Sequence, residues 1–452
     1  MHESLPVLLQ KVEARGLTPE TLVGLIADLK GAFDEAALLA LKDTVLQFEE
    51  RRDVVEHEGR QHRFKLVSEK EWLTPFGLAR VPRRYFQADA GGKGVVPLDV
   101  RSGMVDRYLT PDIEELCAFT AAHLVPNEVA RFLAKVLPQA PSTKAIKRVI
   151  EEAGSFAEEA GEEIEAALRK EAPLSREGDV LVQSWDGVNT PLREAGVKTG
   201  RKPQRPGVRD GDQAPTVWRE AGVAAVSIYG RDKKGKAVRL DTRYLARMPE
   251  PGMATLLAQQ ERVVQPLLKG RKLREVVLLC DGKLTIWDAA KRLSSYPRAT
   301  CILDFFHATE QLSKAAEALF GEKSIPGKRW YEKYRLRLRD EDRGAQAAIR
   351  SLEYHATKLR RGSARHKTVR RVIRYFRRNQ SKMAYADFRA RGLPIGSGPV
   401  EAACKTVVAA RLKRSGMRWS RIGGQYVLNL RVHVLSNRWE VFWKAYRQHR
   451  AA

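Results

Sequence analysis

Three acidic residues give this chain a candidate reaction chemistry. Asp186 and Asp281 each directly follow an apolar run that predicts a strand, and Glu401 lies near the start of a predicted helix that becomes strongly basic. Cleavage and transfer of a phosphodiester bond need an activated oxygen nucleophile and a stabilised, charge-rich transition state. Two divalent ions about 3.5–4 Å apart supply both, and carboxylates are the hard oxygen ligands that such ions prefer. We therefore interpret Asp186, Asp281 and Glu401 as metal ligands and catalytic residues.

Each of these carboxylates also has an ordinary structural explanation. An Asp-Gly pair after a strand often forms a turn. Glu401 can be a first-turn acid favoured by the helix dipole, or a partner of Lys405 four residues later. Three such positions in a suitable order of elements, in a basic chain, favour the catalytic interpretation. Asp288 and Glu310 are rival ligands, but predicted mid-helix positions favour solvated or locally paired side chains for both.

A further catalytic candidate, His307, lies in a D-x-x-H pattern that starts at Asp304, immediately after a predicted strand. One interpretation makes the imidazole a helix cap, or a group that holds a neighbouring carboxylate in place. The other makes it a member of the reacting site. The residues alone leave both open.

Three basic segments are candidates for binding the phosphates of DNA. They are a loop with Gly and Pro after Asp186, the helix face after Glu401, and a basic helix predicted to begin after Ser142. The loop could equally be a disordered segment with no specific role. The candidate contacts are Arg201, Lys202 and Arg205 in the loop, Lys405, Arg411, Lys413, Arg414, Arg418 and Trp419 after Glu401, and Lys144, Lys147 and Arg148 in the basic helix.

The elements that must position the carboxylates follow a recognisable order. Three predicted strands come first, and then helices and strands alternate. This order matches a ribonuclease-H-like α/β core with a mixed sheet, in which Asp186 and Asp281 lie at strand ends. Asp281 and Glu401 are 120 residues apart, which is too far for a simple loop and predicts a large all-helical insertion. The predicted strands are 179–185, 223–229, 237–247, 276–280 and 299–303; the predicted helices are 253–269, 284–293 and those of the insertion within 308–392.

The N-terminal third is predicted to be mostly helical. Residues 4–52 read as two helices, the second capped by Thr18, and a short hairpin lies around residues 74–77. Three short helices follow within 111–153, with starts at Thr110, Asn127 and Ser142. Their spacing is typical of a helix-turn-helix DNA reader, although an ordinary helical bundle explains it as well. We divide the chain into 1–100 (helices and hairpin), 101–172 (helix-turn-helix-like region), 173–310 (first part of the core), 311–392 (helical insertion) and 393–452 (helix of Glu401 and the rest of the core).

Composition restricts the classes of partner. The 452 residues include 81 Lys and Arg against 55 Asp and Glu, a net charge of +26. Such a surface attracts polyanions, and nucleic acid is favoured because each neutralised phosphate releases a counterion. The N-terminus lacks the pattern of a signal peptide and no apolar run is long enough to span a bilayer. The four cysteines are too scattered for a zinc site. We expect a soluble, cytoplasmic, nucleoid-associated protein with no membrane partner.

The motifs around these residues resemble those of the DDE transposases of bacterial insertion sequences, specifically the ISKra type of the Mutator-like group. The matching segments are Trp185-Asp186-Gly187, Cys280-Asp281-Gly282, Asp304-Phe305-Phe306-His307, and the block from Gly396-Ser397-Gly398 to Met417-Arg418-Trp419-Ser420. The resemblance covers about the last three fifths of the chain.

This resemblance implies a function and its partners. It implies a ribonuclease-H-like catalytic core, dependence on two Mg²⁺ ions with Mn²⁺ as a substitute, and binding to the terminal inverted repeats of a mobile element. The resemblance assigns Asp186, Asp281 and Glu401 as metal ligands and His307 as support for the active site or the DNA strand. Because two element ends and a target DNA must be held together, we expect a homo-oligomer, at least a dimer. The alternatives are a DNA-binding repressor or domesticated transposase without cleavage activity, and a ribonuclease-H-like nuclease or resolvase.

Overall fold

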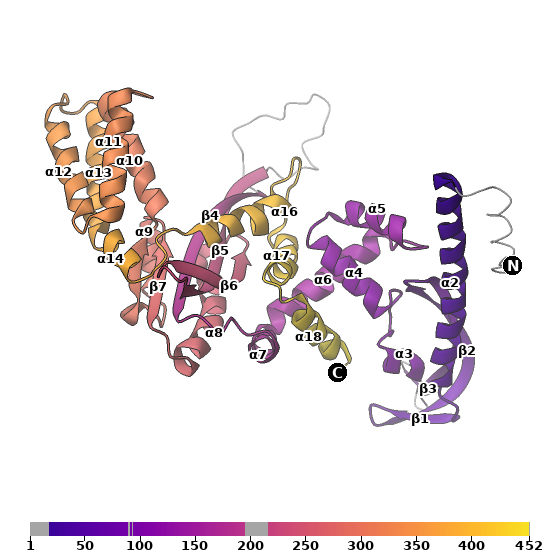
Figure 1. Cartoon of the computed structure of the whole chain (residues 1–452). Coiled ribbons are helices and arrows are strands. Elements are labelled where there is room, and N and C mark those ends of the chain that lie inside the picture. The colour runs from indigo at the N-terminus through magenta and orange to yellow at the C-terminus, as the bar shows by residue number, and fades with distance from the viewer. Residues whose placement is uncertain (1–17, 89–90, 93, 195–215, 452) are drawn as a thin grey trace. The chain divides into compact units, whose positions relative to one another are not determined.

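The computed structural model describes residues 18–88, 91–92, 94–194 and 216–451, which pack as two units (Figure 1). One unit comprises the described residues up to 153 together with 443–451, and the other comprises 154–442. The first helix predicted within 4–52 and the basic residues Arg201, Lys202 and Arg205 lie outside the described residues.

The first unit begins with the long helix α2 (Pro19–Gln47), which starts where the sequence predicts. Thr18 is its N-cap and accepts a hydrogen bond from the Thr21 amide, and Pro19 occupies the first helical position. An antiparallel sheet of β1 (Val54–His57), β2 (Arg60–Thr74) and β3 (Gly77–Ala88) follows. The predicted hairpin is the β2–β3 turn, closed by a 2.8 Å bond from Thr74 Oγ1 to the Gly77 carbonyl. The strands are longer than predicted, and β1 was missed.

Three helices occupy the region predicted to resemble a helix-turn-helix. They are α4 (Pro111–Ala121), α5 (Pro126–Val136) and α6 (Thr143–Glu159), and the short α3 (Pro97–Ser102) precedes them. Thr110 is the N-cap of α4, and Ser142 Oγ accepts from the Ala145 amide at 3.1 Å. The expected cap at Asn127 is wrong, because Pro126 takes the first helical position and moves the N-cap back to Val125.

A mixed five-stranded sheet organises the second unit, in the order β6-β5-β4-β7-β8. The first three strands in the chain pair antiparallel, whereas β7 and β8 run parallel to β4. The α/β class with a mixed sheet is therefore confirmed, and 56% of the structure is helical. The strands are β4 (Val180–Arg193), β5 (Thr216–Arg231), β6 (Ala237–Arg247), β7 (Glu275–Cys280) and β8 (Thr300–Leu303).

Each face of this sheet has its own apolar core, because side chains alternate along the strands. Leu181, Trp185 and Leu278 pack with α8 (Ala254–Gly270) and α9 (Leu284–Ala290). Val182 and Val277 face the other core, which continues into the helical region. Helices α7 (Gly161–Glu171) and α17 (Arg421–Leu435) also belong to this unit, and α18 (Trp439–Ala451) begins in it and continues into residues of the first unit.

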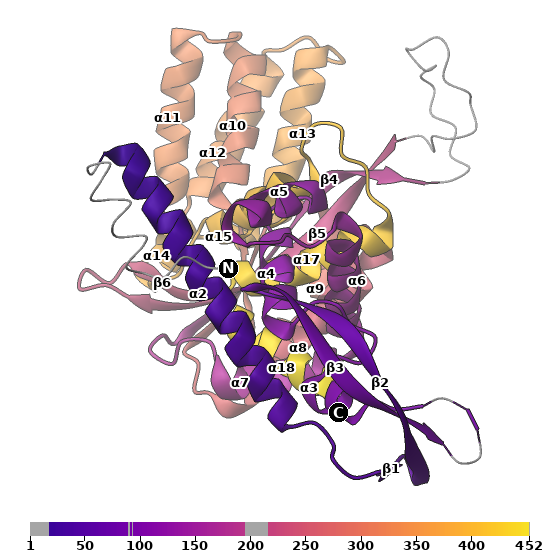
Figure 2. The same ribbon diagram turned by 90° about the vertical axis from the view of Figure 1, so that its right-hand side faces the viewer.

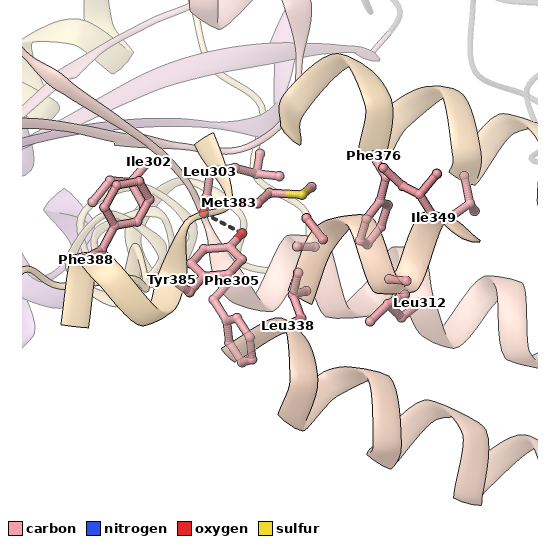
Figure 3. Close-up of a cluster of buried hydrophobic side chains, with 14 of the residues drawn as sticks. Ile302, Leu303, Phe305, Leu312, Leu338, Ile349, Phe376, Met383, Tyr385 and Phe388 are labelled. Atoms are coloured by element: carbon pink, nitrogen blue, oxygen red, sulfur yellow. Dashed lines mark hydrogen bonds between the residues drawn. The ribbon is translucent and has the colours of Figure 1, made fainter. Parts of the chain in front are cut away.

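The helical region predicted after the last strand is present as a bundle in which α10, α11, α12 and α13 run side by side (Figures 1 and 2). Phe376, Ile349 and Leu312 meet in its interior, and the Tyr385 hydroxyl donates a 2.9 Å hydrogen bond to the Leu303 carbonyl at the sheet end (Figure 3). The helices are α10 (Phe305–Phe320), α11 (Ile325–Asp340), α12 (Gly344–Thr357), α13 (Ala364–Asn379) and α14 (Tyr385–Ala390). In the described parts of the chain, no helix has both the length and the apolar character needed to cross a membrane.

Candidate metal centre

The register of two parallel strands brings Asp186 level with Asp281. Pairing of β4 with β7 ends where Gln183 lies opposite Leu278. Asp186 lies three residues further along β4, and Asp281 lies three residues after Leu278, just past the end of β7. By the alternation of the strands, both side chains continue the face of Val182 and Val277, toward the helical bundle. The expectation that Asp186 ends its strand is wrong, because β4 continues to Arg193 by pairing with β5. What ends before Asp186 is the pairing with β7, which leaves that side of β4 open.

Asp281 is a buried carboxylate at the start of a short helix. Its Oδ1 accepts the Lys283 amide at 2.8 Å, and its carbonyl accepts the Trp287 indole N–H at 2.8 Å. Burial raises the pKa of Asp281, the Lys283 amide and ammonium lower it, and the charge of Asp186 raises it again. A cation next to Asp281 would therefore offset a cost that the fold imposes on its charged form.

Lys283 is a residue of this site that the sequence interpretation missed. Its Nζ lies 2.7 Å from Glu220 Oε1 and 3.7 Å from Asp281 Oδ2. Both Lys283 and Asp186 line a cleft of about 580 Å³ that also exposes Asp288 and Arg292. The signal in the sequence was the position of Lys283, two residues after the aspartate.

Asp304 connects the start of α10 to the segment that precedes Glu401. It is fully buried and is the N-cap of α10, where its Oδ1 accepts the His307 amide at 2.9 Å. Its other oxygen accepts the amide of Ser397, the residue before α15 (Gly398–Ala403). A 2.9 Å bond from the Phe305 amide to the Ile395 carbonyl adds a second connection. Both oxygens of Asp304 thus serve the backbone, so its role is to position its neighbours.

His307 and Glu401 are brought together by these connections. His307 Nε2 lies 3.8 Å from Glu401 Oε1, and its Nδ1 lies 3.7 Å from Glu310 Oε2. The Ser397 hydroxyl lies 3.3 Å from the same Glu401 oxygen. Within the described residues, Asp304, His307 and Glu401 form a group whose ligand atoms all lie within 4.8 Å of one another, and Asp186 and Asp281 belong to no such group. His307 thus belongs to a close group with Glu401, whereas the three predicted ligands Asp186, Asp281 and Glu401 do not all lie within that distance of one another.

Cys404 connects the helix of Glu401 to Asp186. Its thiol donates a 3.6 Å hydrogen bond to Asp186 Oδ2, and burial together with the charge of Asp186 raises the pKa of that thiol. The residue begins a π-helical segment, Cys404–Ala409, which is followed by the short α16 (Ala410–Leu412). Arg431 donates from Nε to the Thr406 and Val407 carbonyls at 2.9 and 2.8 Å, and so satisfies backbone groups of that segment. The sequence interpretation gave this cysteine no role at the site, although it lies three residues after Glu401.

The predicted DNA contacts after Glu401 divide into exposed and internal side chains. Lys405, Lys413 and Arg414 are exposed and Arg418 is half-buried. Arg411 is a correction: its side chain is fully buried, with its guanidinium 5.1 Å from the ring centre of Trp419. Trp419 is half-buried and its indole N–H donates to the Leu412 carbonyl at 3.0 Å. The buried Arg411 therefore offers no surface to DNA, because it packs inside the segment it was expected to make basic.

In α6, Lys144 and Lys147 are exposed. Arg148 is also exposed but is engaged within its own unit. Its Nε donates to Glu152 at 2.7 Å and it also bonds the Asp106 carbonyl. Lys144 and Lys147 are thus directed to solvent and form no such pair with any residue that the structure describes.

Comparison of the chain with protein-family models and with curated proteins finds no match. The chemistry of the site must therefore be inferred from its own donors. Asp186, Asp281 and Glu401 offer oxygen ligands of the kind that suits Mg²⁺ or Mn²⁺, whereas the neutral imidazole of His307 suits later transition metals better. The donor set fits a hard divalent cation, with His307 as a neighbour of the Glu401 carboxylate.

Proposed function

We propose that this protein is a DDE-type DNA transposase that cuts and joins DNA strands. Its catalytic, metal-binding residues would be Asp186, Asp281 and Glu401. The observation that carries the proposal is the register of β4 and β7, which makes Asp186 and Asp281 level on one face, beside the helix of Glu401. A sheet with three antiparallel strands extended by two parallel ones is also what a ribonuclease-H-like core requires. The resemblance of the four motifs to ISKra-type transposases supports the same assignment.

The roles of the residues follow from their surroundings. Asp186, Asp281 and Glu401 would hold Mg²⁺, which when bound supplies Lewis-acid activation of the attacking oxygen and charge stabilisation. Lys283 offsets the charge of Asp281 and Glu220 at the mouth of the cleft. His307, whose Nε2 lies 3.8 Å from Glu401 Oε1, would help to fix the position of that carboxylate. Asp304 holds the backbone that carries both residues.

The partners proposed are double-stranded DNA in two forms, the terminal inverted repeats of the element and a target. The net charge of +26 supports binding to phosphates, and exposed Lys144 and Lys147 make α6 a candidate reader of the repeats. Holding two ends requires at least a dimer on DNA.

The test is cleavage of a labelled duplex that carries the inverted repeats flanking the coding region, with Mg²⁺ or Mn²⁺. Glu401→Gln should lower the cleavage rate by orders of magnitude, because it removes the charge of a ligand while preserving its size. Glu317→Gln is the matched control, since Glu317 is an exposed glutamate on α10 away from this cluster. The control should cut at the wild-type rate.

Three outcomes are distinguishable. Metal-dependent cuts at the repeat boundary that vanish only in Glu401→Gln support the transposase. Specific binding without cutting by the wild-type protein would refute it in favour of a DNA-binding repressor. Cutting of branched or hybrid substrates without need of a repeat would instead indicate a ribonuclease-H-like nuclease or resolvase.

A further inference from the structure

Helix α13 (Ala364–Asn379) has an apolar face and a purely basic face. Val369, Val372, Ile373 and Phe376 are buried in the helical bundle. Every charged side chain of the helix other than His366 is a lysine or an arginine, and none is acidic. At 100° per residue, five of these cations fall within an arc of about 100° opposite the apolar face. We call them the α13 track: Lys367, Arg370, Arg371, Arg374 and Arg378, all exposed.

The cations of the α13 track are largely unneutralised. Among the described residues, Lys367, Arg370 and Arg374 have no acidic partner. Arg371 donates a 3.4 Å hydrogen bond to the Thr368 hydroxyl and has no acidic partner in the described ranges. Arg377, which lies beside the track, is paired with Glu353 of α12 and is therefore excluded from it. Repulsion along this face is a cost that a bound polyanion would remove.

One end of the track lies at the candidate metal centre. Arg378 donates a 3.0 Å hydrogen bond to the carbonyl of Gly282, the residue after Asp281. Tyr375 packs so closely on Gly282 that an added Cβ would lie 2.3 Å from its ring. Burial raises the pKa of the Tyr375 hydroxyl, and the nearby charge of Asp281 raises it further. The basic face therefore begins beside a catalytic carboxylate and extends up the bundle.

We propose that the α13 track binds the phosphate backbone of one strand of the duplex DNA that enters the metal centre. This rests on the proposed function. From Lys367 to Arg378 the helix rises about 16.5 Å. One strand of DNA has a phosphate about every 3.4 Å along its axis, or about five over that length. Five cations thus face about five phosphates, and a rigid helix presents them without the ordering cost of a flexible loop.

The experiment measures binding of the full-length protein to a labelled duplex of about 30 base pairs between about 50 and 200 mM salt. The variant is Lys367→Gln/Arg370→Gln/Arg374→Gln, which spares Arg378 and its bond to Gly282. The control is Lys328→Gln/Arg329→Gln/Lys333→Gln, which removes the same charge from exposed positions of α11 in the same bundle. A third protein, Arg370→Lys/Arg374→Lys, keeps the charge of the track.

Each contacted phosphate contributes about −0.9 to the slope of log K against log salt. The track variant, which lacks three cations, should therefore reduce the magnitude of that slope by about 2.7. Its affinity near 150 mM salt should fall on the order of tenfold to a hundredfold, whereas the α11 control and the lysine variant should stay within about threefold of wild type. Equal thermal melting of all four proteins establishes that folding is intact. Equal weakening by the track and control variants, or a track variant that binds as wild type does, would overturn the inference. If the wild-type protein itself fails to bind duplex DNA, the proposed function fails with it.

Discussion

Asp304→Asn should loosen the segment that carries Glu401 without removing any proposed ligand. The native carboxylate accepts two backbone N–H groups, from His307 at 2.9 Å and from Ser397, and it has no exposed surface. Asparagine is an equally good N-cap, but only one of its two terminal atoms is an acceptor. Whichever way the amide turns, one N–H group faces another donor. Loss of a buried, charge-assisted hydrogen bond of this kind costs about 2 kcal/mol.

The assay is hydrogen–deuterium exchange of the peptide that covers residues 395–403, because a chain of two units need not unfold in a single transition. A local loss of about 2 kcal/mol should accelerate exchange there on the order of 30-fold. Cleavage should fall as well, by up to about a hundredfold if Glu401 moves by about 1 Å.

Ser363→Ala provides the matched control for the Asp304 variant. Ser363 is the N-cap of α13, accepts the His366 amide at 3.2 Å, and is not bonded to the Glu401 segment. Its loss should cost about 1 kcal/mol and accelerate exchange only at the start of α13. If exchange over 395–403 in Asp304→Asn matched that in wild type, Asp304 would not be the group that holds the helix of Glu401, and the reasoning would be refuted.

Three further results are expected. The ring of His433 is stacked on that of Phe442, with the ring centres 4.3 Å apart. Burial, and then the charges of nearby arginines, lower the pKa of His433 to about 3. Because the folded state favours the neutral imidazole, the contribution of His433 to stability is fully present above pH 6.5 and is lost as the pH falls, by about 2 kcal/mol at pH 5. His433→Phe should remove that pH dependence in urea titrations, and an unchanged acid slope would contradict the assignment. Arg431→Met removes the donor to the Thr406 and Val407 carbonyls of the π-helical segment, and leaving such a buried acceptor unsatisfied costs about 1–3 kcal/mol. Hydrogen–deuterium exchange over residues 404–409 should therefore become faster, and cleavage should become slower. The four cysteines should resist a thiol reagent at pH 8 until the protein is denatured, because burial raises the pKa of each thiol; rapid labelling of the native protein would show that at least one is accessible.

Local patterns were enough to predict most elements of the second unit. The strand predicted at 237–247 has those bounds as β6, and β7 differs from its prediction by one residue. In both strands, the apolar residues and the flanking turns are local signals of the strand. The extension of β4 to Arg193 was missed because residues 186–193 are polar or mixed, and they are held as a strand by pairing with β5, about 30 residues later.

Part of the candidate site was likewise predictable from the sequence, and part was not. The types and order of Asp186, Asp281 and Glu401 were readable from the chain, as was the D-x-x-H pattern. The bond from Asp304 to Ser397 and that from Cys404 to Asp186 were not, since they join residues 93 and 218 positions apart. The burial of Arg411 was missed for the same reason, because a basic run says nothing of which face packs inward.

The sequence by itself determined the class of elements, the charge that favours a polyanion, and the carboxylates available to a divalent cation. These depend on side-chain chemistry and on contacts between near neighbours in the chain. Only the tertiary structure decided that Asp186 and Asp281 are level, that His307 lies beside Glu401, and that the cations of α13 point away from the bundle and begin next to Gly282. Those relations depend on strand register and helix packing, which are fixed by the burial of apolar surface from distant segments together.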